Sequence, residues 1–169
     1  MTRLRLFILT LFCCGLAFSS LQAQGYEKAI GLRLGYPVSI SYKMFLNNSN
    51  NAIEAFVNYR SQKVFSYGWT RVGVGAAYQV HNPISEVDGL QWYYGGGASL
   101  YFWTYDDGFA DFADEANLSL GIQGYLGLDY KFANAPVNLS LDWVPTFYIS
   151  EYGDGFGADN GALAVRYTF

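Results

Sequence analysis

Residues 117–132 read NLSLGIQGYLGLDYKF, and this stretch decides the fold. From Leu118 to Phe132 every second residue is apolar or glycine, whereas the residues between them are polar, small or charged apart from Tyr125. A period of two over this length is typical of a β-strand whose two faces meet different environments. At roughly 3.3 Å per residue, such a strand can cross a bilayer even when tilted, because about 9–11 residues suffice.

Seven further segments repeat the alternation, so the sequence predicts eight strands. The additional strands are expected at 29–36, 38–45, 52–60, 70–81, 90–103, 137–149 and 161–169. Pro145 has no N–H to donate to a strand ladder, so the seventh strand should bulge or end near it. No helical period and no linker interrupts the series, which indicates one domain over residues 24–169.

The charged residues within these strands all lie on the face opposite the apolar residues. A lipid-facing Arg or Lys near the bilayer midplane costs about 2–4 kcal/mol, so a charge-free apolar face is what lipid contact requires. The opposite face, rich in glycine and serine, suits a narrow lumen. We expect a lumen charge network in which Lys43 faces Glu54 across a hairpin with Arg71 on the next strand; the alternative is that lumen water solvates each charge. The nine residues are Arg33, Lys43, Glu54, Arg60, Arg71, Asp129, Lys131, Asp142 and Arg166.

An exposed strand edge cannot exist in lipid, because each unpaired backbone group costs several kcal/mol there. The strands must therefore close, and the predicted fold is an all-β, eight-stranded antiparallel up-and-down transmembrane β-barrel. An even number of strands places both termini on one side, the periplasm, and the loops at 61–68, 104–116 and 150–160 on the outside. The middle loop is acidic but lacks the EF-hand spacing of a calcium site. Its acidic residues are Asp106, Asp107, Asp111, Asp114 and Glu115.

This pattern covers the whole of residues 24–169 and resembles the small eight-stranded bacterial outer-membrane barrels, such as OmpX and the transmembrane domain of OmpA. The final strand, ALAVRYTF, is similar to the C-terminal signal read by the barrel assembly machinery, with Tyr167 and Phe169 as its aromatic residues. Ala164 departs from the glycine usual in such signals. The resemblance implies a monomer in the bacterial outer membrane, with outer-membrane lipid and lipopolysaccharide as partners and the barrel assembly machinery as a partner during biogenesis.

Residues 1–23 have the features of a secretory signal peptide. Arg3 and Arg5 precede an apolar segment at 6–18, and the small residue Ala23 provides a cleavage site. The alternative is a retained membrane anchor. Both cysteines fall inside this segment, so the mature chain is expected to contain no disulfide.

The composition and a few single residues argue against several classes of function. A formal net charge of -4 argues against nucleic-acid binding, which needs basic patches. The only histidine, His81, falls at the predicted periplasmic end, and we predict no catalytic set, no metal site and no cofactor. The leading prediction is a non-enzymatic outer-membrane protein with a structural, adhesive or surface-binding role through its outer loops. The alternatives are a narrow pore or transporter, and a soluble lipocalin-like barrel with the opposite face assignment.

Overall fold

The structure, a computed structural model, describes residues 26–46, 49–64, 67–106, 117–150, 155–158 and 160–169. Strands and their turns make up this part of the chain. The first half contains β1 (Lys28–Tyr36), β2 (Val38–Phe45), β3 (Asn51–Val64), β4 (Tyr67–Pro83) and β5 (Leu90–Asp106). The second half contains β6 (Asn117–Lys131), β7 (Val137–Trp143), β8 (Thr146–Ser150), β9 (Gly155–Gly157) and β10 (Gly161–Thr168).

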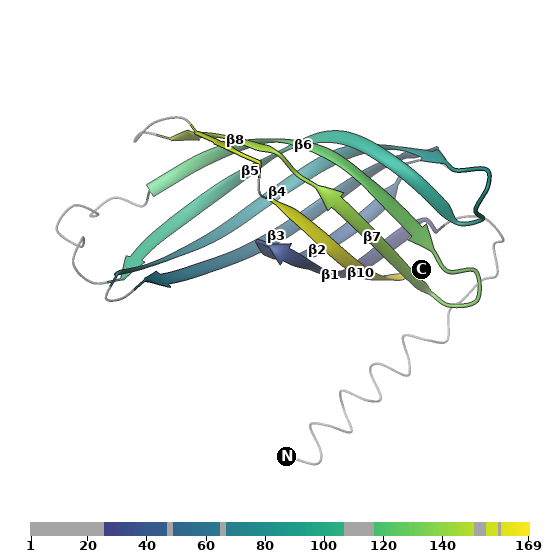
Figure 1. The fold of residues 1–169 in the computed structure, drawn as a ribbon, viewed down its shortest axis with the longest axis horizontal. Helices are drawn as coiled ribbons and strands as arrows, with labels where there is room; N and C mark the ends of the chain where they lie inside the picture. The colour runs from purple at the N-terminus through teal and green to yellow at the C-terminus, as the bar shows by residue number, and fades with distance from the viewer. Residues whose placement is uncertain (1–25, 47–48, 65–66, 107–116, 151–154, 159) are drawn as a thin grey trace, which may run out of the picture.

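The strands close into a barrel in which sequence neighbours pair antiparallel (Figure 1). β1 pairs with both β2 and β10, and β5 pairs with β6, so the sheet has no break around its circumference at the level of these strands. β7 and β8 both lie against β6 and are two halves of the seventh strand. β9 and β10 likewise make up the eighth, so the predicted eight-stranded antiparallel up-and-down barrel is confirmed.

Several strand limits differ from those predicted. The predicted loop at 61–68 lies mostly within a hairpin, in which Ser61 is paired with Thr70. Polar residues on the exposed side hide this extension, because the apolar alternation stops at Tyr59. Part of the predicted loop at 150–160 forms β9. The predicted interruption at Pro145 is confirmed, since β7 ends at Trp143 and β8 begins at Thr146, immediately after Pro145.

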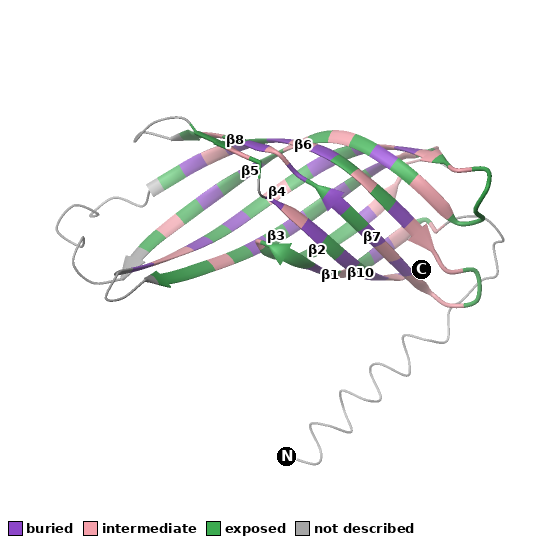
Figure 2. Cartoon of the chain, viewed as in Figure 1, coloured by how far each residue is buried: buried purple, intermediate pink, exposed green. Residues whose placement is uncertain are grey.

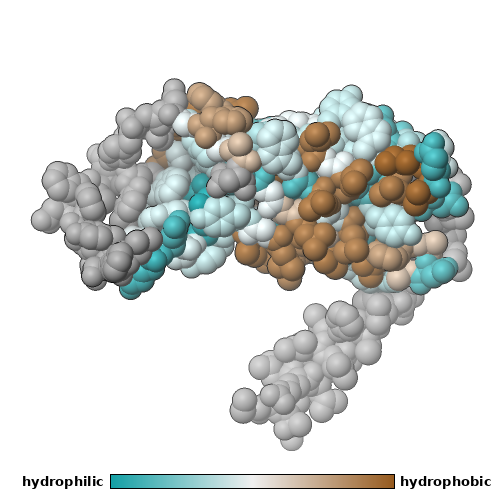
Figure 3. Space-filling model, viewed as in Figure 1, coloured by the Kyte–Doolittle hydropathy of each residue, from teal (hydrophilic) through white to brown (hydrophobic). Residues whose placement is uncertain are grey.

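The two faces of the barrel wall have opposite polarity. Buried and exposed residues alternate along each strand (Figure 2), and apolar surface gathers over the middle of the visible wall (Figure 3). Thirty large apolar side chains among the described residues are at least 37% exposed, from Ile30 to Phe169. Charged side chains fill the inside instead. Those no more than 5% exposed are Arg33, Lys43, Glu54, Arg71, Asp129, Asp142 and Arg166.

The barrel has two different ends. We call "base" the end that holds the start of β1, the end of β10 and the turns β2–β3, β4–β5 and β6–β7, and "rim" the opposite end (Figure 1). β3 to β6 have 14 to 17 residues, and β7 and β8 together follow β6, whereas β1 has 9 residues and β2 has 8, so the wall is about half as tall at β1 and β2. The short side stops at the cis peptide bond Tyr36-Pro37.

Above that short turn the wall is not closed within the described residues. From Arg60 onward β3 pairs only with β4, because its last partner in β2 is opposite Tyr59. On the other flank, β9 pairs only with β8. The rim half is therefore a sheet with two strand edges, and it leaves a gap between β3 and β9 over the Tyr36-Pro37 turn.

Candidate functional site in the barrel lumen

Glu54 is the centre of a group of buried charges in the base half of the lumen. Arg166 Nη2 donates to Glu54 Oε1, and Gln79 Nε2 donates to Oε2 at 2.7 Å. Arg33 Nη1 lies 3.6 Å from the same Oε1, and its Nη2 donates to Asp142 Oδ1 at 2.8 Å. One carboxylate thus joins arginines from two neighbouring strands, β1 and β10.

A second ion pair lies closer to the base. Lys43 Nζ is 3.1 Å from Asp129 Oδ2, and Asn138 Nδ2 donates to Asp129 Oδ1. The hydroxyl of Tyr26, which precedes β1, donates to the same carboxylate at 3.2 Å. Burial and the charge of Asp129 raise the pKa of Tyr26 well above its ordinary value, so this phenol remains a neutral donor.

Together these side chains form a neutral set, which we call the base network. Its three cations and three anions offset one another, and every member is at most 5% exposed. Such burial is tolerated only when each ion has partners, because an unpaired buried charge costs several kcal/mol. Ser140 Oγ, 2.6 Å from Arg166 Nη1, supplies a further acceptor. The members are Arg33, Lys43, Glu54, Asp129, Asp142 and Arg166.

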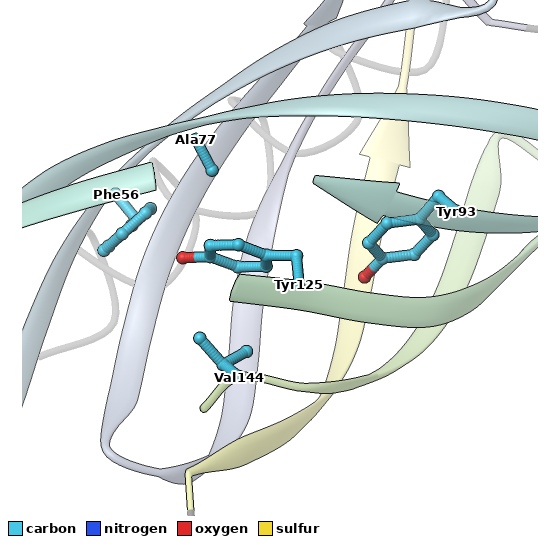
Figure 4. Close-up of a cluster of buried hydrophobic side chains, with 5 residues drawn as sticks. All are labelled: Phe56, Ala77, Tyr93, Tyr125 and Val144. Atoms are coloured by element: carbon cyan, nitrogen blue, oxygen red, sulfur yellow. The ribbon is translucent and has the colours of Figure 1, made fainter. Parts of the chain in front are cut away.

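An aromatic layer covers the base network on its rim side. Tyr125 lies at the middle of this layer, between Phe56 and Tyr93 (Figure 4). The Arg33 guanidinium carbon is 5.7 Å from the ring centroids of both Phe56 and Tyr125. Tyr93 ties the layer to the network, since its hydroxyl donates to Asp142 Oδ2 at 2.8 Å. Network and rings together fill the lumen, as expected for an eight-stranded barrel.

The rim half of the lumen holds a different group, the rim cluster: Asn58, Arg60, Arg71, Tyr101, Tyr148 and Asn160. The Arg71 guanidinium carbon lies 4.4 Å from the Tyr101 ring centroid and 5.6 Å from that of Tyr148. Arg71 Nη1 donates to the Tyr148 hydroxyl at 3.3 Å, and Asn160 Nδ2 donates to the same hydroxyl at 2.9 Å. Arg60 is half-buried and lies 3.2 Å from the centroid of the Tyr36 ring.

A small cavity lies beneath the rim cluster. Its volume is about 30 Å³, enough for one or two water-sized groups. Asn58, Tyr101 and Asn160 line it from above, and Arg33 lines it from the base side. Three lining atoms, Arg33 Nε, Asn58 Oδ1 and Asn160 Oδ1, are buried and have no hydrogen-bond partner within the described residues.

The predicted lumen charges divide between these two regions, and part of the prediction was wrong. Lys43 is opposite Glu54 in the β2–β3 register, as expected, but its ion pair is with Asp129, whereas Glu54 pairs with the arginines. The strongly curved wall brings side chains from across the lumen closer than the neighbour on the next strand. Arg71 lies among aromatic rings near the rim instead of in the base network.

Two other predicted lumen charges lie at the ends of the barrel. Arg60 stacks at the rim, and Lys131 lies at the base, where its Nζ donates to the backbone carbonyls of Phe132 and Ala135. His81 is 1% exposed and stacks on Tyr93. Its placement at the base end agrees with the prediction.

The remaining predicted residues lie at the chain ends or outside the described part. Tyr167 and Phe169 stack at the base, with ring centroids 6.2 Å apart. Asp106 ends β5, whereas Asp107, Asp111, Asp114 and Glu115 lie outside the described residues, as does the predicted signal peptide at 1–23. The inward tyrosines of β5 and β6 were missed, although their positions share the parity of the charged face.

Comparisons with protein-family models, with curated proteins and with solved structures gave no match. Among the residues that the structure describes, no group of three or more His, Cys, Asp or Glu side chains could hold a metal ion. No helix in that part of the chain is long and apolar enough to cross a membrane. We therefore infer the function from the arrangement of the lumen and of the outer wall.

Proposed function

We propose that this chain is a non-enzymatic bacterial outer-membrane β-barrel with a filled lumen and a structural, adhesive or surface-binding role carried by its rim. The observation that supports this most is the inverted polarity of the wall: charges inside and apolar side chains outside around the circumference. Export by the segment at 1–23, insertion by the barrel assembly machinery through the strand ending at Phe169, and contact with lipid and lipopolysaccharide belong to the same proposal.

The inverted polarity argues against the soluble lipocalin-like alternative. A soluble ligand-binding barrel needs apolar side chains inside and charges outside, and soluble monomers rarely expose an apolar patch beyond about 300–600 Å². Here Leu141 is 59% exposed and Ile40 is 59% exposed, while Lys43 and Glu54 are fully buried. Hydrocarbon is the solvent that stabilises this distribution, because it leaves no exposed apolar surface in water.

The uneven height of the wall supports an orientation. Unpaired strand edges in lipid are excluded, so the edges of β3 and β9 near the rim belong in water beyond the bilayer. The 17-residue strands β4 and β5 exceed the 9–11 or so residues needed to span, which leaves several residues to project. The rim then faces the exterior and the base faces the periplasm.

The filled lumen disfavours the pore alternative. The cavity between the rim cluster and Arg33 has a volume of only about 30 Å³. A planar-bilayer recording of the purified protein should show no stable open conductance. A persistent conductance would favour the pore over the surface-binding role.

Membrane localisation is tested by cell fractionation combined with heat-modifiable gel mobility, and by placing a charge on the wall. Leu141→Arg should abolish or strongly reduce outer-membrane insertion, because the charge would enter hydrocarbon at a cost of about 2–4 kcal/mol. The matched control is Val87→Arg, since Val87 is a 44% exposed residue in the β4–β5 turn. Detergent-free recovery of a soluble monomer, with Leu141→Arg no worse than the control, would overturn the proposal.

A further inference from the structure

Two arginines face each other across neighbouring strands near the rim. Arg60 of β3 and Arg71 of β4 are Cα partners in the antiparallel register, and like charges placed directly opposite are destabilising. Among the described residues, the ion pairs involve Arg33, Lys43 and Arg166 only. Among the described side chains, this part of the lumen therefore holds two cations that form no ion pair, in contrast with the neutral base network.

Aromatic rings lie against both guanidinium groups. Arg71 stacks near Tyr101 and Trp103, and Arg60 lies between Tyr36 and Trp69. Within the described residues, Arg71 Nε and Nη2 and Arg60 Nε are buried without a hydrogen-bond partner. Stacking fixes the plane of a guanidinium, and its N–H edge is the part that binds an oxyanion with two parallel hydrogen bonds.

A further polar group lies beside Arg71. The Tyr148 hydroxyl accepts from Arg71 Nη1 and from Asn160 Nδ2, so its own proton can be donated to an oxyanion. Arg60 and Tyr148 are only half-buried, and Arg60 lies on the β3 edge beside the gap between β3 and β9. A ligand from the rim can approach along this gap and reach the two arginines when the Tyr148 side chain moves aside.

We propose that the rim cluster binds the phosphate group of an exterior ligand between Arg60 and Arg71. Two arginines at paired positions on neighbouring strands match a phosphate monoester, which carries about −1.5 to −2 charges at pH 7, better than a single carboxylate. The ligand is either a free phosphate ester or the phosphate of a surface glycolipid. The proposal rests on the proposed function, because the rim must face the exterior for either to arrive.

The test uses the full-length protein folded in detergent micelles and titrated with inorganic phosphate, phenyl phosphate and, for comparison, acetate. Binding is followed by calorimetry and by tryptophan emission, because Trp69 and Trp103 contact the two arginines and lie 5.1 Å apart. We expect saturable binding of the phosphates and much weaker binding of acetate. The glycolipid source is distinguished in vesicles: lipopolysaccharide should compete with phenyl phosphate only if its phosphate occupies the same site.

Variants decide whether the arginines are responsible. Arg71→Gln and Arg60→Gln should each weaken phosphate binding at least tenfold, because each removes a charge-assisted hydrogen bond. Arg71→Lys keeps the charge but loses the planar fork, so it should fall between wild type and Arg71→Gln. Lys63→Gln is the matched control, since Lys63 is exposed and lies on the opposite face of β3.

Gel mobility of each sample before and after heating distinguishes failure of the phosphate-binding inference from failure of the proposed function. Variants that keep the folded mobility but bind phosphate as tightly as wild type would overturn the inference and leave the proposed function standing. A loss as large in Lys63→Gln would also overturn it, because the effect would then be nonspecific attraction. A protein that folds without detergent would instead contradict the proposed function. If Arg71→Gln does not fold, Arg71→Lys and Arg60→Gln decide the outcome.

Discussion

The base network and the rim cluster use the same side chains in opposite ways. Both place arginines against aromatic rings inside one lumen: Arg33 beside Phe56 and Tyr125, and Arg71 beside Tyr101. In the base network each cation has a carboxylate within 4 Å, whereas at the rim the described residues provide none. The difference indicates that the base arrangement serves stability, because each of its charges has a partner of opposite sign without any ligand.

The pairing of every charge in the base network makes its stability depend on each partner. Buried ion pairs gain little over well-packed apolar residues, but loss of one partner leaves a charge that nothing compensates. The base network should therefore be sensitive to single substitutions, and the rim cluster should not. Four substitutions or pairs of substitutions test this contrast, and each is measured as the free energy of unfolding by urea titration of protein folded in lipid vesicles.

Glu54→Gln should have the largest effect. It removes the carboxylate shared by Arg33 and Arg166 and leaves two buried cations facing a neutral amide, which we expect to cost about 3–5 kcal/mol. Glu86→Gln serves as the control, because Glu86 is an exposed acid in the β4–β5 turn and should change stability by less than about 0.5 kcal/mol. Equal effects of the two substitutions would mean that lumen water solvates the charges, the alternative considered from the sequence.

The Lys43–Asp129 pair should respond unequally to removal of each partner. Asp129→Asn leaves Lys43 as a buried cation without its carboxylate, and we expect a loss of about 3 kcal/mol. Lys43→Met should cost only about 1–2 kcal/mol, because Asn138 and Tyr26 still donate to the Asp129 carboxylate. The double substitution should cost no more than Asp129→Asn alone. Additive losses would show that the two side chains do not act as a pair.

An added methyl group should cost more near the base than near the rim. A Cβ at Gly31 would lie 2.0 Å from the backbone oxygen of Val165, so Gly31→Ala must push β1 away from β10 and should cost about 2 kcal/mol. At Gly73 the nearest atoms belong to the side chains of Asn58 and Tyr101, both 2.6 Å away, which can move aside. Gly73→Ala should cost about 1 kcal/mol, and a reversed order would contradict a rigid base and an adaptable rim.

The barrel and its two faces were predicted well from the sequence. Side chains alternate along a strand with a period of two, and this alternation can be recognised without knowing how the strands pair. It placed the inward charges of the base network on the correct face and located the break at Pro145. The pairing partners were not predictable, since they depend on curvature: Lys43 meets Asp129, 86 residues away, and not Glu54 opposite it. Register gives the neighbours along the wall but not across the lumen.

The strand lengths and the rim cluster were not predicted from the sequence, for a related reason. Above Tyr59 the outward residues become polar, so the apolar alternation ends while the strand pairing continues to Val64. The rings that lie against Arg71 come from two strands far apart in the sequence, Tyr101 and Trp103 from β5 and Tyr148 from β8, and no spacing in the sequence joins them. Tyr101 could have been recognised, because its parity in β5 matches that of the inward Ser99.

Arg71→Gln should change stability least, by less than about 1 kcal/mol, because the lost stacking is offset by relief of repulsion from Arg60. Arg166→Gln, the same substitution at the base, should cost several times as much, since it deprives Glu54 of a partner. Phosphate should also distinguish Arg71→Gln from wild type. At about 100 times its Kd, phosphate should raise the free energy of unfolding of wild type by about 2.7 kcal/mol, and that of Arg71→Gln far less. Equal phosphate stabilisation of both proteins would show that Arg71 has no role in binding.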